Sequence, residues 1–169
     1  MTTMADRYRR WFAYEKDAHE KTLASLETVP QERRSDPAFA KAIGLVGHLV
    51  AARQLWLFRF GVRSKGPTTV AELFPSDIPL DELAAAIGDM HEEWTDYLRD
   101  LDDAELARVF EYRALEGARF RNRIEDLLTQ LFGHSWYHRG QVASIVRSLG
   151  GKPAVTDYVF WVREPVEGA

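Results

Sequence analysis

The sequence lacks cysteine entirely, which excludes disulfide bonds and thiolate metal ligands from this chain. It also lacks any uninterrupted apolar run that approaches the roughly 18 residues needed to cross a bilayer, and its first residues lack the apolar segment of a signal peptide. We therefore expect a cytoplasmic protein that does not associate with membranes. If thiol chemistry occurs here, the thiol must come from a small molecule.

An excess of positive charge is also missing, because the formal net charge is −4. Such a chain has no general attraction for nucleic acid phosphates, so we expect a small-molecule substrate rather than a nucleic acid. No glycine-rich phosphate loop or nucleophile elbow is present. The positive charge that does cluster comes from Arg108, Arg113, Arg119, Arg121 and Arg123. These arginines could attract an anionic cosubstrate, and no base-reading motif accompanies them.

The 169 residues suit one domain that covers residues 1–169 and buries roughly two-thirds of its unfolded surface. Apolar residues at three-and-four spacing predict helices over about 5–26, 37–60 and 80–101, and a last helix that ends at Gly150. The long, proline-containing connection 62–79 favours a crossover between helices over a tight turn.

Between residues 108 and 121 the apolar period changes to two, which predicts a small β-hairpin. A three-residue loop ending at Gly117 would pair Tyr112 with Phe120 and Glu111 with Arg121. Asn122 and Glu125 then resemble a capping box that opens the last helix. At the other end of the chain, 158–162 is too apolar for a free tail, so we expect it to pack across the protein or on a second copy in a homodimer.

His134 and His138 lie four residues apart, about one helical turn, and can therefore bind the same ion from one helix face. Their stripe is otherwise apolar, and burying polar groups there without partners would cost about a few kcal/mol each. His48 lies near the centre of a second apolar stripe, on the helix 37–60. If the two helices face each other, three neutral imidazoles can bind one divalent ion and leave a coordination position open.

These motifs resemble those of the DinB/YfiT-like family of damage-inducible, metalloenzyme-type proteins, and the similarity covers most of the chain. It rests on a histidine followed by an aromatic-rich helix, then His-x-x-x-His-Arg-Gly-Gln, a closing Gly-Gly-x-Pro and a Thr-Asp-Tyr tail. The resemblance implies an all-α four-helix bundle, with the crossover and the small hairpin before the last helix. It also implies a divalent metal ion bound by His48, His134 and His138.

The resemblance narrows the chemistry without naming the substrate. Relatives include thiol-dependent S-transferases and isomerases, whereas many members have no assigned reaction. A metal-dependent enzyme that uses a low-molecular-weight thiol as cosubstrate is therefore the first hypothesis. Zinc is the expected ion and nickel the alternative, because both suit imidazole ligands. A metal-dependent hydrolase and a metal-binding stress-response module without catalysis are the competing hypotheses.

Several residues near these histidines are candidates for supporting roles. Gln141 shares their stripe and could orient an imidazole or a water molecule. Arg139 points away from the stripe and could bind a substrate carboxylate, anchor the hairpin or bridge to a carboxylate of a neighbouring helix. Trp56 is expected in the core first and in a pocket wall second. His91 could be a fourth ligand or contact one, whereas His19 lies among charged residues and is expected to be exposed.

Overall fold

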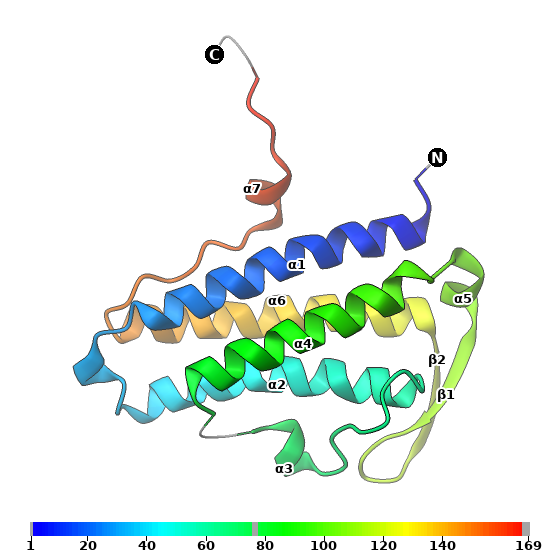
Figure 1. Ribbon diagram of the computed structural model, residues 1–169, viewed down its shortest axis with the longest axis horizontal. Coiled ribbons are helices and arrows are strands. Elements are labelled where there is room, and N and C mark those ends of the chain that lie inside the picture. Colours follow the sequence, from blue (N-terminus) through cyan, green and yellow to red (C-terminus); the bar gives the residue numbers. More distant parts are fainter. Residues whose placement is uncertain (1, 76–77, 167–169) are drawn as a thin grey trace.

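The protein is described here by a computed structural model that covers residues 2–75 and 78–166. Its four long helices are α1 (Met4–Glu27), α2 (Pro37–Arg59), α4 (Leu80–Arg99) and α6 (Ile124–Ser148). Helix α1 packs against α4 and α6, and α2 packs against the same two helices (Figure 1). Helices α2 and α4 run in the same direction, so the segment between them crosses back along the bundle (Figure 1). The predicted four-helix bundle with a crossover connection is confirmed.

Shorter elements connect or follow the long helices. They are a 3-10 turn (Gln31–Arg33), α3 (Val70–Leu73), α5 (Asp103–Ala107), strands β1 (Val109–Arg113) and β2 (Arg119–Arg123), and α7 (Tyr158–Val162). Within the described residues, no helix is both long enough and apolar enough to cross a membrane.

The hairpin has the predicted register, with Tyr112 opposite Phe120 and Glu111 opposite Arg121. Gly117 in the loop has a φ of 95°, a left-handed conformation that favours glycine. The ring of Tyr112 packs edge-on against Trp56 of α2, with centroids 4.9 Å apart. The hairpin is therefore fixed to the end of α2, and its loop forms a wall beside the bundle.

The predicted start of the last helix is wrong by one residue. Arg123 is the N-cap of α6, and its backbone N–H donates to the Asp126 carboxylate over 3.3 Å. Asn122 instead stays in β2 opposite Phe110, and its side-chain oxygen accepts a hydrogen bond from the Tyr112 hydroxyl. Pairing within the hairpin holds Asn122 in the extended conformation, so the helix begins after it. Helix α2 is capped by Asp36, whose side chain accepts from the N–H of Ala38.

The C-terminal segment leaves the end of α6 and returns along α1 (Figure 1). The Tyr158 and Trp161 rings of α7 pack against Tyr14 of α1, with centroid distances of 5.1 and 5.9 Å. The Tyr14 hydroxyl donates to the carbonyl of Thr156. Packing across the same protein chain, one of the two predicted arrangements, is therefore observed.

Candidate metal centre and its pocket

His48 of α2 and the pair His134 and His138 of α6 meet between the two helices. The Nε2 atom of His134 lies 3.0 Å from the Nε2 atoms of both other rings. All three residues offer ligand atoms within 4.8 Å of one another. A tetrahedral zinc ion with Zn–N bonds of 2.0–2.1 Å would hold such nitrogens about 3.3 Å apart. Two of the separations lie slightly below this value and all lie within 4.8 Å, so the cluster can hold one ion of this size after a small adjustment of the rings.

In two of the rings, a hydrogen bond from Nδ1 fixes both the orientation of the ring and which nitrogen carries the proton. Nδ1 of His48 donates to the carbonyl of Leu73 over 2.7 Å, and Nδ1 of His138 donates to Oε1 of Gln141 over 2.7 Å. A neutral imidazole that carries its proton on Nδ1 presents a lone pair on Nε2. Both Nε2 lone pairs consequently point into the cluster. Gln141 therefore orients the His138 ring, and its role beside a metal ligand stays a prediction.

The crossover connection supports His48 in a way that the sequence did not indicate. Phe74 stacks on the His48 ring, with centroids 4.0 Å apart and planes within 8° of parallel. The connection lies so close to α2 that a β-carbon at position 47 would be only 3.0 Å from the Pro75 ring. Gly47 has no β-carbon, so the close approach is possible. The small residue in α2 therefore allows the Leu73 carbonyl to reach the imidazole.

Burial favours the neutral form of His48 and of His134. Desolvation lowers the pKa of His48 below its usual value, although the hydrogen bond to Leu73 raises it again in part. Desolvation, followed by repulsion from His138 and His48, lowers the pKa of His134 to about 4. Neutral imidazoles have free lone pairs, so this environment suits metal coordination near neutral pH.

A pocket of about 370 Å³ opens beside the cluster, and His48 and His134 form part of its wall. It lies between α2, α3, α6 and the hairpin loop. The other lining residues are Ala52, Leu55, Trp56, Arg59, Val70, Leu73, Ala114, Leu115, Glu116, Gln130 and Leu131. Trp56 is thus both packed against the hairpin and part of the pocket wall. The pocket gives a small molecule access to the three-histidine cluster.

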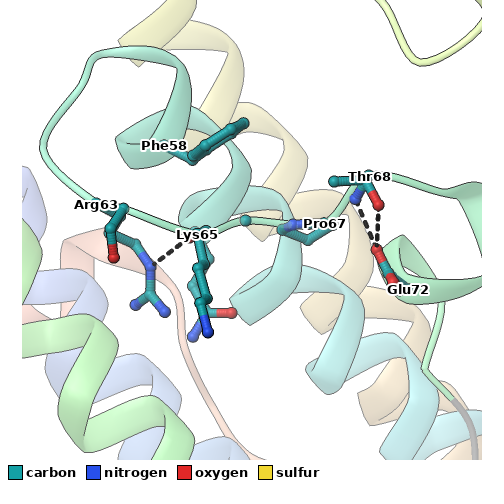
Figure 2. Close-up of a pocket in the computed structure, with 9 residues that line it drawn as sticks. Phe58, Arg63, Lys65, Pro67, Thr68 and Glu72 are labelled. Carbon is teal, nitrogen blue, oxygen red and sulfur yellow. Dashed lines mark hydrogen bonds between the residues drawn. The ribbon is translucent and has the colours of Figure 1, made fainter.

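A larger hollow of about 530 Å³ lies between Phe58 and the loop that follows α2. Figure 2 shows this region, where Thr68 donates to Glu72 and Arg63 donates to the carbonyl of Lys65. Arg63 also forms an ion pair with Glu93. Among the described residues that line this hollow there is no histidine, so the three-histidine cluster adjoins the smaller pocket and not this one.

His91 does not join the three-histidine cluster. Its Nε2 atom lies 3.0 Å from Nδ1 of His19, and the two rings stack with centroids 5.3 Å apart. The prediction that His19 is exposed is wrong, because its exposed fraction is only 2%. His19 follows Tyr8, Phe12 and Glu15 on one buried stripe of α1. That stripe was the available signal, and the charged neighbours of His19 obscured it.

A buried polar network surrounds His19. Arg53 of α2 forms an ion pair with Glu15, and both side chains are almost fully buried. Arg139 donates to the Tyr14 hydroxyl over 2.7 Å and lies 3.8 Å from a Glu15 oxygen. Arg139 therefore bridges to a carboxylate of a neighbouring helix, one of its three predicted roles. The sequence reasoning missed Glu15 and Arg53, because charged residues at helical positions usually indicate exposure.

Three of the five hairpin arginines have partners close to them in sequence. Arg108 forms an ion pair with Glu105, and Arg119 forms one with Glu111. Arg113 donates weakly to the carbonyl of Gly117 over 3.4 Å. These side chains are largely exposed, and none of the five hairpin arginines lines the pocket beside the histidines.

The bundle and its three-histidine cluster define the class of protein, namely a four-helix bundle with a cluster that could hold a metal ion beside an open pocket. The chain belongs to the DinB family, whose family model matches residues 1–165. The family membership expected from the sequence motifs is confirmed. Comparisons with curated proteins and with solved structures give no match.

Proposed function

We propose that this protein is a divalent-metal-dependent enzyme that acts on a small molecule, with His48, His134 and His138 as the metal ligands. Zinc is the expected ion and nickel the alternative, because three nitrogen ligands of intermediate softness suit both. The observation that carries the proposal is the convergence of three Nε2 atoms at the wall of an open pocket. A purely structural site would be closed by a fourth protein ligand.

The reaction that we favour is transfer to or from a low-molecular-weight thiol. A bound divalent ion would supply Lewis acidity, which lowers the pKa of a coordinated water or thiol. Three neutral imidazoles would leave the charge of the ion uncompensated, and the chain has no cysteine that could compete as a nucleophile. Leu73 and Gln141 would hold two of the ligands in place, while the apolar side chains of the pocket would exclude water from the reacting atoms.

Metal content tests the ligand assignment. Protein purified without an affinity tag is expected to bind about one divalent ion per chain, measured by elemental analysis. Alanine at His48, His134 or His138 should each reduce loading sharply. His91→Gln is the matched control, because His91 is buried but pairs with His19 away from the cluster. Full metal content in the His134→Ala/His138→Ala variant would refute the assignment.

Thiol titration separates the enzyme from its alternatives. Small thiols are expected to change the absorbance of the nickel-loaded protein and to form conjugates with electrophiles in the zinc and nickel forms. The His134→Ala/His138→Ala variant gives the background rate. If thiols change neither signal above that background, metal-dependent hydrolysis or a metal-binding module without catalysis replaces the transferase proposal. Turnover of activated esters or amides by the loaded protein then favours the hydrolase.

A further inference from the structure

Arg59 is the single arginine among the described residues that line the pocket beside the three-histidine cluster, and we propose that it binds a terminal oxyanion of the substrate. The substrate class would be an elongated small molecule with an apolar body and a carboxylate or similar group at the end distant from the histidines. This inference rests on the proposed function, because it concerns the same pocket. It assigns to Arg59 the anion-binding role that the sequence suggested for the hairpin arginines.

Arg59 is held in a fixed orientation at the hairpin end of the pocket. Its guanidinium lies over the rings of Trp56 and Tyr112, at 4.6 and 5.0 Å from their centroids. One of its nitrogens, Nη2, donates to the carbonyl of Arg113 over 2.9 Å. An arginine that is already ordered by two aromatic faces and one carbonyl loses little conformational freedom when it binds a ligand.

The charge of Arg59 lacks a close carboxylate. Among the ion pairs that the described residues form, none involves Arg59, whereas Arg108 and Arg119 of the hairpin region each have one. Burial lowers the pKa of Arg59, and the interactions with Tyr112 and then with Glu116 on the exposed hairpin loop offset only part of that effect. A half-buried guanidinium with unused N–H donors is a suitable partner for an oxyanion, which it can bind through two parallel hydrogen bonds.

The distance between Arg59 and the histidines defines the length of the ligand. Arg59 follows His48 by eleven positions in α2, which corresponds to about 16 Å along the helix axis. Side chains in a helix lean toward its N-terminus, and because both Arg59 and His48 lean in this way, the separation of the guanidinium and the imidazole along the axis stays of the same order. The pocket between these two ends is lined by apolar side chains, including Leu55, Val70 and Leu131.

A purely structural role is the competing explanation, because Arg59 lies in the last turn of α2, where a cation interacts favourably with the helix dipole. A structural arginine would affect stability without distinguishing acids from amides. Matched ligands therefore separate the two roles. Octanoate and octanamide differ in charge while sharing the same apolar body, and binding to the protein as purified can be measured by calorimetry.

We expect octanoate to bind about tenfold more tightly than octanamide, the size of effect typical of charge-assisted hydrogen bonds. Arg59→Gln should abolish this preference, and Arg59→Lys should retain part of it. Arg119→Gln is the matched control, since Arg119 is an exposed arginine that pairs with Glu111 outside the pocket. Glu116→Gln removes the resident negative charge of the pocket and should increase octanoate affinity, so it tests the proposal even if Arg59→Gln unfolds.

A second arm uses mercaptooctanoate and mercaptooctanamide with the nickel-loaded protein, followed by metal absorbance. Preference for the acid in both arms, lost in Arg59→Gln, supports the substrate class and the thiol chemistry together. Preference for octanoate without any thiol-dependent absorbance supports Arg59 and overturns only the thiol reaction. Equal affinity for acid and amide in the wild type, or a preference that survives Arg59→Gln, overturns the assignment of Arg59 even if thiols bind at the histidines.

Discussion

Replacing Glu15 by glutamine should destabilise the bundle far more than its position among charged residues of α1 would indicate. Glu15 is fully buried, forms an ion pair with Arg53 and lies 3.8 Å from Arg139. His19 in the same network is neutral, because burial and the two arginines lower its pKa well below the usual value. Glu15 is therefore the carboxylate that compensates two buried guanidinium groups.

The magnitude follows from this charge balance. Glutamine keeps the shape of the side chain but leaves Arg53 and Arg139 as buried cations without a compensating anion. Removing one partner of a buried ion pair typically costs about 3–5 kcal/mol. For a chain of this size each kcal/mol lowers the melting temperature by about 2–4 °C, so we expect a decrease of roughly 6–20 °C.

Urea unfolding followed by circular dichroism measures the free energy of unfolding, and calorimetry gives the melting temperature. The matched control is Glu111→Gln, which breaks an exposed ion pair with Arg119 and should change stability by less than about 0.5 kcal/mol. A loss of less than about 1 kcal/mol in Glu15→Gln would refute the charge-balance argument. It would mean that solvent or a proton compensates the buried arginines.

Three further predictions concern the metal and the buried histidines. Chelation should lower the melting temperature without abolishing helicity in circular dichroism, because the apolar core is large; complete loss of helical signal would show that the metal site is structural. Gln141→Leu should weaken metal affinity by roughly 10- to 100-fold in a dye-competition assay, since it removes the acceptor for Nδ1 of His138. Unchanged affinity would contradict the role of Gln141 in orienting His138. Burial, followed by Lys16 and Arg53, lowers the pKa of His91 to about 4, so the unfolded chain takes up a proton first as the pH falls below about 6.5. Stability should therefore decrease by a few kcal/mol between about pH 6.5 and pH 4, and His91→Gln should reduce this slope in urea unfolding; an identical slope in the variant would argue against a neutral, buried His91.

Local sequence patterns were sufficient to predict which face of a helix or strand a residue occupies, wherever a single periodicity determines that face. Spacing of four residues places His134 and His138 on the same helix face, and the apolar stripe around His48 places it toward the core. Alternation of period two, with glycine in the loop, was enough to predict the hairpin register that pairs Tyr112 with Phe120. These features depend on backbone geometry that is the same in any helix or strand.

Only the tertiary structure decided which polar residues could be buried. Glu15 and His19 read as part of an exposed charged stretch, and their burial depends on Arg53 and Arg139, which come from two other helices. The support of His48 by the Leu73 carbonyl likewise depends on a connection that returns along α2. Sequence periodicity assigns a side chain to a face of its own element. The free energy of burying a charge, however, depends on partners that other elements supply. This free energy is therefore determined only when the helices pack.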